Sequence, residues 1–180
     1  MILSGAGVIS ACAHVREDRT YRAKAVRLCE EVTEAVRKET ELPEGTVGIL
    51  RIPALSVECP VADSTETDIL QTHAGLIEGS DVPGTSGGNT AIAAHSARNG
   101  FLCSFCWFQK IAELKQGDEI SLLYRDGRTY PYAVYEVMEG LFPEDPEPFQ
   151  REEGREILTL QTCTQGSPVY RTYVHAERIA

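Results

Sequence analysis

The stretch Ile157-Leu158-Thr159-Leu160-Gln161-Thr162-Cys163-Thr164 decides how this chain folds and where its chemistry lies. Its apolar and β-branched residues predict a short buried strand that ends near Cys163. Residues 165–168 include a glycine and a proline, and they predict a tight loop. The chain resumes at 169–175 with a second strand-like run, and Arg171 lies near its start. A thiol and a guanidinium are therefore separated by one loop.

A thiol beside a fixed cation suits acyl transfer. The sulfur of Cys163 is a nucleophile for a carbonyl carbon, and Arg171 can stabilise the oxyanion that forms. A base is also required, and His95 is a candidate at the polar end of a strand-like run, 89–94. Each residue alone has an ordinary explanation, since a cysteine at a strand end is usually a small buried side chain. The three together predict a catalytic site.

These residues also resemble a known family. Thr159-Leu160-Gln161-Thr162-Cys163, with Arg171 eight positions later, is similar to the signature of the sortases. Residues 88–95, with the sequence Gly-Asn-Thr-Ala-Ile-Ala-Ala-His, resemble the sortase segment that carries the catalytic histidine. The order of histidine, cysteine and arginine agrees with that family. The resemblance extends over residues 46–179.

The expected fold is mostly β. Many short strand-like runs separated by turn signals predict a closed or nearly closed barrel. The resemblance implies the closed eight-stranded sortase barrel with short helices and an N-terminal helix, in which Cys163 ends the seventh strand and Arg171 lies on the eighth. Other strands are predicted at 47–52, 57–61, 89–94, 119–124 and 129–137. A short helix is predicted at 65–72, a helix or helical turn at 101–114, and irregular connections at 75–88 and 143–156.

The resemblance implies a cysteine transpeptidase. Cys163 would attack the carbonyl of an LPXTG-like sorting signal on a secreted protein and form a thioester, which an amine of the cell wall or a pilin lysine then resolves. His95 would protonate the leaving amine, and Arg171 would contact the substrate carbonyl and the oxyanion. Thr162 is expected to bind substrate or orient the thiol, although a plain strand threonine fits nearly as well. The reaction requires no cofactor and no metal.

Composition narrows the class of protein further. The chain has 180 residues, of which 42% are hydrophobic and 24% charged, enough for one folded domain with an appendage. The net charge of −10 argues against a nucleic-acid partner, because no basic patch is available to neutralise phosphates. It is compatible with a cationic peptide or an amine substrate.

The chain is predicted to divide into an N-terminal segment, 1–45, and a catalytic barrel, 46–180. Residues 2–13 are apolar but fewer than the roughly 20 residues that span a bilayer. We interpret them as a remnant of a membrane anchor, with a frayed apolar tail as the alternative. Residues 15–40 predict an amphipathic helix. The resemblance implies an enzyme at the extracytoplasmic face of the bacterial membrane, anchored by this segment.

Cys103 and Cys106 form a CxxC pair. A zinc site would need two more ligands at comparable spacing, and the sequence shows none. The favoured interpretation is two packed, partly buried thiols. A disulfide or an adventitious metal is the alternative.

Other classes of protein fit less well. An L,D-transpeptidase is also a β-rich cysteine acyl transferase, but it has Ser and Gly before the cysteine and Arg two residues after it, where this chain has Gln161-Thr162 and Gln165. A papain-like peptidase places cysteine upstream of histidine, the reverse of the order here. A barrel that only binds peptides is the non-enzymatic alternative. Within the sortases, the N-terminal segment lacks the Asp-Pro-aromatic lid motif of class C, which favours a class D-like or related enzyme.

Overall fold

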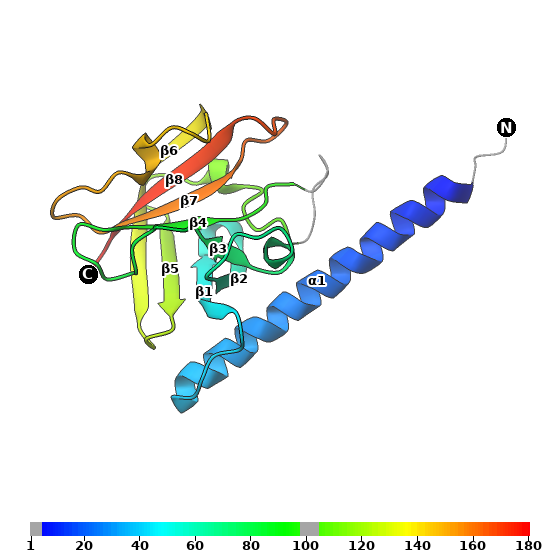
Figure 1. Cartoon of the computed structure of the whole chain (residues 1–180), viewed down its shortest axis with the longest axis horizontal. Helices are drawn as coiled ribbons and strands as arrows, with labels where there is room; N and C mark the ends of the chain where they lie inside the picture. Colours follow the sequence, from blue (N-terminus) through cyan, green and yellow to red (C-terminus); the bar gives the residue numbers. More distant parts are fainter. Residues whose placement is uncertain (1–4, 98–104) are drawn as a thin grey trace.

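The computed structural model describes residues 5–97 and 105–180, with side chains from residue 19 onward. A long helix, α1 (Gly5–Lys38), precedes the strands β1 to β8, which close into a barrel. Figure 1 shows α1 lying diagonally across the outside of this barrel. The strands are β1 (Thr46–Ile52), β2 (Val57–Ala62), β3 (Ala74–Leu76), β4 (Asn89–Ala93), β5 (Glu119–Tyr124), β6 (Thr129–Leu141), β7 (Ile157–Cys163) and β8 (Arg171–Arg178).

The predicted closed barrel of eight strands is confirmed. Its strands follow the order β1-β2-β3-β4-β7-β8-β6-β5, and β5 pairs with β1 to complete the ring. Most neighbouring strands are antiparallel, but β4 runs parallel to β7. A parallel pair needs a long crossover connection, and for β4 and β7 this crossover contains β5 and β6. The strand that precedes His95 and the strand that ends at Cys163 are therefore neighbours, although they are far apart in the sequence.

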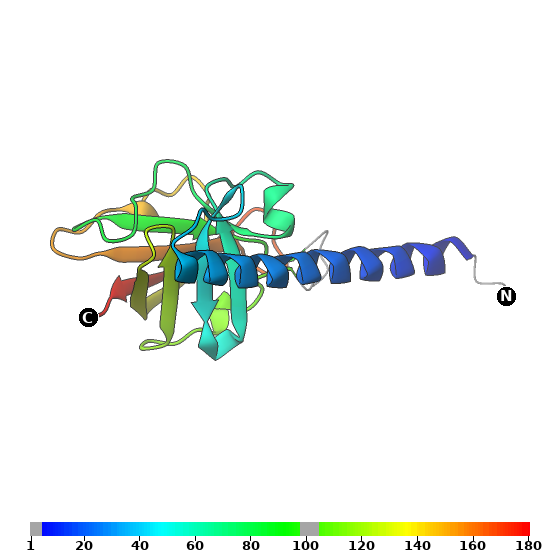
Figure 2. The ribbon, with the colours of Figure 1, turned by 90° about the horizontal axis from the view of Figure 1, so that it is seen from below.

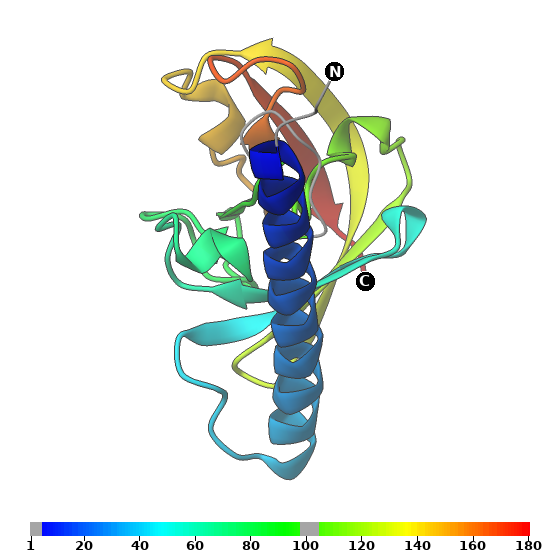
Figure 3. The same cartoon turned by 90° about the vertical axis from the view of Figure 1, so that its right-hand side faces the viewer.

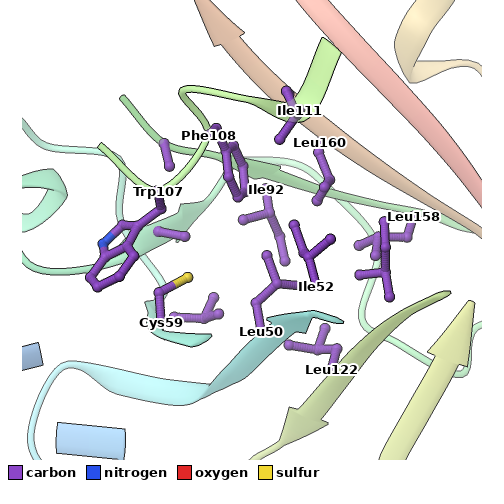
Figure 4. Close-up of a cluster of buried hydrophobic side chains, with 14 of the residues drawn as sticks. Leu50, Ile52, Cys59, Ile92, Trp107, Phe108, Ile111, Leu122, Leu158 and Leu160 are labelled. Carbon is purple, nitrogen blue, oxygen red and sulfur yellow. The ribbon is translucent and has the colours of Figure 1, made fainter. Parts of the chain in front are cut away.

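Alternate side chains of the strands fill the barrel interior. Figure 4 shows aliphatic side chains from β1, β4 and β7 meeting there, all of them fully buried: Leu50, Ile52, Ile92, Leu158 and Leu160. Trp107 and Phe108, from the connection that follows β4, join the same cluster. The described part of this connection, residues 94–97 and 105–118, is held against the barrel although it contains no regular α-helix.

Helix α1 binds the barrel through a narrow apolar stripe. Ala25, Cys29 and Val32 recur at helical spacing and are buried. Cys29 and Val32 form a small cluster with Ile49 of β1 and Leu123 of β5. The stripe explains why the helix stays attached along its C-terminal half, where these residues lie.

The N-terminal half of α1 projects beyond the barrel. Figures 1 and 2 show it extending on the side where β7 connects to β8, and Figure 3 looks along that direction. The helix is longer than the predicted 15–40, because it already begins at Gly5 within the apolar run. In the described residues, no helix combines the length and the apolar character that crossing a membrane requires.

The structure forms turns rather than longer helices in the described parts of the two segments predicted to be helical. Within 65–72 only the 3-10 turn η2 (Ile69–Gln71) forms. Within 101–114, residues 101–104 lie outside the described residues, and the rest forms turns and the 3-10 turn η3 (Ile111–Glu113). Phe105, Trp107 and Phe108 are all buried at a spacing that one helix face does not provide, so the chain follows the barrel surface instead.

The prediction that residues 75–88 contain no regular structure is wrong at its start. Strand β3 pairs there with β2 and β4. Gly75 makes this possible, because a Cβ at this position would lie 2.1 Å from the carbonyl oxygen of Ser64. In a sequence, a glycine beside so short an apolar run indicates a turn rather than a strand.

The favoured interpretation of the CxxC pair is wrong for Cys106, which is disulfide-bonded. Cys103 lies outside the described residues. A buried thiol and a buried disulfide half occupy similar apolar positions, so sequence context does not report the oxidation state. Among the described cysteines, Cys29, Cys59 and Cys163 are free.

Candidate active site

The parallel register of β4 and β7 places His95 beside Cys163. The two strands pair in register along their length, and the last pair joins Ala93 to Gln161. The same register continued by two residues sets His95 opposite Cys163, at the carboxyl end of both strands. Both residues are partly exposed, as a reacting pair must be.

Two hydrogen bonds fix these strand ends. The hydroxyl of Thr162 donates to the carbonyl oxygen of Ala94 at 2.7 Å, and the Ala94 N–H donates to the carbonyl oxygen of Gln161 at 3.2 Å. The first bond joins the residue before Cys163 to the residue before His95. Thr162 is buried, so this bond supports the role of orienting the strand ends. Its role in binding substrate stays a prediction.

Arg171 is the register partner of Cys163 across the antiparallel pair of β7 and β8. Its Nη1 atom donates to three carbonyl oxygens of the intervening loop, those of Pro168 at 2.9 Å, Tyr170 at 3.2 Å and Val169 at 3.5 Å. These bonds do not use the Nε and Nη2 donors, which belong to the same rigid plane. The structure therefore brings all three predicted catalytic residues to one end of the barrel.

The loop between β6 and β7, residues 142–156, is attached to the strands beneath it through one carbonyl oxygen. This oxygen belongs to Pro148, within the 3-10 turn η4 (Glu147–Phe149). Three side chains donate to it: Asn89 Nδ2 at 3.2 Å, His175 Nε2 at 2.9 Å, and Thr159 Oγ1 at 3.1 Å, which shares its proton with Asn89 Oδ1 at 2.8 Å. All three are buried. Because they come from β4, β7 and β8, they attach the loop to the strands that lead to the catalytic residues.

A second attachment joins this loop to the chain that enters β4. Arg151 makes two hydrogen bonds to the carboxylate of Asp81, at 2.7 and 2.8 Å. The guanidinium holds the pKa of Asp81 below its usual value. The same carboxylate accepts the N–H of Asn89 at 2.9 Å, and the Asn89 side chain donates to the carbonyl oxygen of Gln150 at 3.1 Å.

Aromatic side chains lie beneath and beside the loop. Phe149 meets Tyr173 of β8 edge-on, with 5.6 Å between the ring centroids, within the roughly 4.5–7 Å that aromatic pairs prefer. Tyr173 is fully buried, and burial raises the pKa of its hydroxyl, which has no hydrogen-bond partner in the described structure. Phe142 and Tyr170 form a more exposed pair, 5.1 Å between centroids, that joins this loop to the loop carrying Pro168.

Two cavities lie near these residues. One, of about 490 Å³, lies between the connection before β4 and the loop after β6, and its lining includes Ile77, Asp81, Asn89, Ala91, Phe149 and Arg151. The other, of about 130 Å³, is lined by Cys163 itself and by residues that include Ser96, Lys110, Glu113, Glu139 and Thr172. In the described part of the chain, no three His, Cys, Asp or Glu side chains are grouped to hold a metal ion.

Sequence reasoning did not single out the residues that attach the loop. Pro148 acts through a main-chain oxygen, which no side-chain signature reports. Asn89 offered a weak signal, because an amide buried at the first position of an apolar strand needs hydrogen-bond partners. His175 is one of four histidines in the sequence, and no local pattern indicates that it holds this loop.

Another histidine, His73, is buried just before β3. Its Nδ1 lies 2.8 Å from the hydroxyl of Thr72, and its Nε2 lies 3.2 Å from the hydroxyl of Thr46. Burial, with a smaller effect of Lys24, lowers the pKa of His73. This histidine is a buried neutral side chain of the barrel.

The chain is similar to a known protein family and to curated proteins of that family. A family model described as the Sortase domain matches residues 50–179. The chain is 34% identical over 131 residues to Sortase A of Bacillus anthracis, which covers 72% of this chain and 58% of that protein. It is 27% identical over 148 residues to Sortase A of Streptococcus agalactiae, and this match covers 82% of this chain and 58% of that protein. The chain thus spans 58% of the length of these curated relatives.

Solved structures are similar over a comparable region. Sortase C1 of Streptococcus agalactiae has a TM-score of 0.68 at 27% identity, covering 76% of this chain and 69% of that chain. Sortase C of Streptococcus pneumoniae has a TM-score of 0.68 at 31% identity, covering 77% and 68%.

Proposed function

The chain belongs to the sortase family, and from this membership we propose that it is a cysteine transpeptidase that joins secreted proteins to an amine. Its first substrate would be an LPXTG-like sorting signal. Its second would be an amine of a cell-wall precursor or a pilin lysine. The observation that carries the proposal is the register of β4, β7 and β8, which gathers His95, Cys163 and Arg171 at one end of the barrel.

In the first half of the reaction, the Cys163 sulfur attacks the carbonyl carbon at the cleavage point of the sorting signal. The carbon–nitrogen bond breaks, and His95 gives a proton to the leaving amine. The product is a thioester between Cys163 and the secreted protein. In the second half, the acceptor amine attacks the thioester, and the carbon–sulfur bond breaks.

Arg171 has a separate task in this scheme. Each half-reaction passes through a tetrahedral oxyanion, and a cation fixed beside the sulfur stabilises that charge. The donors of Arg171 that its own loop does not use are available for the substrate carbonyl. Thr162 keeps Cys163 and His95 in register through its bond to Ala94.

Sortases as a family act outside the cytoplasm in association with the membrane. We extend this to a proposal that residues 1–13 belong to a membrane anchor. Helix α1 projects from the barrel on the side where β7 connects to β8, as Figures 1 and 3 show. An anchor at that end would turn the catalytic end of the barrel toward the membrane.

The test is incubation of the protein with a library of LPXTG-like peptides, followed by mass spectrometry of the intact protein. We expect a peptide-derived acyl adduct that maps to Cys163 and that an added amine removes. The matched control is Cys163→Ala, which should show neither adduct nor cleavage while keeping its fold, because alanine fits a strand end without strain. Measurable peptide cleavage by Cys163→Ala would exclude Cys163 as the nucleophile.

A further inference from the structure

We propose that the cavity of about 130 Å³ beside Cys163 binds the acceptor amine, and that Glu139 recognises its ammonium group. This inference rests on the proposed transpeptidation, since it assigns a place to the second substrate of that reaction. The ligand is a small primary amine at the end of a flexible chain.

The size and position of the cavity point to this substrate. Cys163 lines it directly, so a group bound there lies next to a thioester on the sulfur. Its volume of about 130 Å³ is well below the roughly 300 Å³ at which pockets begin to enclose drug-sized ligands. The cavity therefore suits the end of one side chain rather than an extended peptide. The larger cavity, of about 490 Å³, is not lined by Cys163 and lies toward the first residues of β4.

The charges around the cavity favour a cation. Lys110 and Glu113 lie on its rim with 4.0 Å between Nζ and Oε2, so their charges largely compensate each other. Glu139 makes no hydrogen bond or ion pair within the described residues. A carboxylate without a partner thus remains in a cavity that the catalytic sulfur lines. An alkylamine is protonated at neutral pH and complements this charge.

A bulge in β6 aims Glu139 at the cavity. The pairing of β6 with β8 shifts between Glu139 and Leu141, and Gly140 has a φ of 77°. Such bulges occur near active sites, where they redirect a side chain. Glu139 pairs in register with Thr172, which also lines the cavity.

Glu139 acts in binding and is not consumed. The bound ammonium gives one proton to solvent and becomes the free amine, and its nitrogen attacks the carbonyl carbon of the thioester. The carbon–nitrogen bond forms, the carbon–sulfur bond breaks, and the second proton that the nitrogen loses is taken up by the Cys163 sulfur. An amide and a free thiol are the products, so the step needs no other reactant.

The test measures how the thioester divides between transfer and hydrolysis. The full chain is acylated with a peptide that forms the Cys163 adduct, and glycinamide or Nα-acetyl-lysinamide is added over a range of concentrations. In Glu139→Gln, we expect the concentration for half-maximal transfer to rise about two- to fivefold, as loss of one screened charge pair implies. Hydrolysis and the KM for the peptide should not change. The difference in half-maximal acceptor concentration between Glu139→Gln and the wild type should become smaller at high salt.

Two further variants sharpen the result. Ala112→Lys adds a positive charge at the rim of the same cavity and should also raise the acceptor concentration that transfer requires. Glu119→Gln removes an exposed carboxylate at the start of β5, which does not line the cavity, and should leave transfer unchanged. Equal acceptor dependence in Glu139→Gln, Glu119→Gln and the wild type, with normal acylation, would overturn the inference. Absence of an acyl adduct on the wild type would instead contradict the proposed function, and the inference with it.

Discussion

At the scale of single residues, the role of Arg171 depends on the planar shape of its guanidinium group as well as on its charge. Its Nη1 is held by the carbonyl oxygens of Pro168 and Tyr170, so the guanidinium plane is fixed before substrate arrives. A lysine keeps the charge but loses the planar set of donors. We therefore expect Arg171→Lys to lower kcat by about 10²- to 10³-fold, the usual effect of removing an oxyanion donor. Steady-state kinetics on a sorting peptide measure this.

The control for this variant lies on the same strand. Arg178 donates to the carbonyl oxygen of Pro131 at 3.2 Å and lies over the ring of Tyr130, away from the catalytic end. Arg178→Lys should keep nearly normal kcat/KM. A similarly mild effect of Arg171→Lys would show that Arg171 contributes only its positive charge to catalysis.

His73 makes stability depend on pH. Its pKa is lowered by burial in the folded protein, whereas the unfolded chain binds a proton with the ordinary pKa of about 6.5. Below about pH 7 the unfolded state therefore binds more protons than the folded state, so stability falls as pH falls. One such site contributes a slope of at most about 1.4 kcal/mol per pH unit.

The variant His73→Gln separates this contribution from that of other groups. Glutamine can still bond to Thr46 and Thr72 but does not titrate. We expect urea denaturation between pH 7.5 and 5.5 to show a smaller loss of stability in the variant than in the wild type. Parallel pH dependence of the two proteins would contradict this role for His73.

At the scale of elements, the loop after β6 depends on the carbonyl oxygen of Pro148. Asn89 donates to this oxygen and to that of Gln150, and it is almost fully buried. Asn89→Ala leaves these oxygens short of a donor, a loss of about 1–3 kcal/mol. We expect a looser loop, faster proteolysis within 142–156, and a several-fold higher KM for the sorting peptide with a smaller effect on kcat.

An isosteric change provides the matched comparison. Asn89→Asp keeps the size and the acceptor for the Thr159 hydroxyl, but it places a carboxylate oxygen against two carbonyl oxygens. At pH 8 this variant should loosen the loop at least as much as Asn89→Ala. Unchanged proteolysis in both variants would show that the remaining attachments, including Arg151 with Asp81, are sufficient.

The elements that bear the chemistry could be predicted from the sequence, because each is a short apolar strand that ends in a reactive side chain. This holds for the strands before His95 and Cys163. The pairing of those strands could not be derived from local pattern, since a parallel register is set by contacts across a long crossover. Strand β3 was missed because Gly75 indicates a turn locally, although it permits close backbone approach in the fold. The attachment at Pro148 involves a main-chain oxygen, which leaves no trace in side-chain sequence.

At the scale of the whole molecule, α1 and the barrel share a buried contact that thiols can report. Val32 is fully buried beside Cys29, and burial raises the pKa of Cys29 to about 12. Cys59 is also fully buried with a raised pKa, so neither thiol should react in the native protein. We expect Val32→Ala to lower the free energy of unfolding by roughly 2 kcal/mol and to speed alkylation of both cysteines.

The control for the helix contact is Val26→Ala on the same helix. Val26 is 46% exposed, so its truncation should change stability by less than about 0.5 kcal/mol. Peptide mapping after brief treatment with iodoacetamide measures the labelling of Cys29, Cys59 and Cys163, the free thiols of the described residues, at once. Rapid labelling of Cys29 in the wild type, at a rate like that of Cys163, would show that the helix does not shield it.

The ring order of the barrel also has a consequence for biosynthesis. Strand β4 has only a short pairing with β3 until β7 arrives, because its five-residue ladder is made with β7. A chain emerging from a ribosome or a translocation channel therefore presents β4 with an open edge while residues 94–156 are still being made. Such edges are prone to pair with other chains. Insertion of β7 covers that edge and also brings Cys163 to its place beside β4. The nascent chain therefore becomes reactive only when the edge that could pair with other chains is closed.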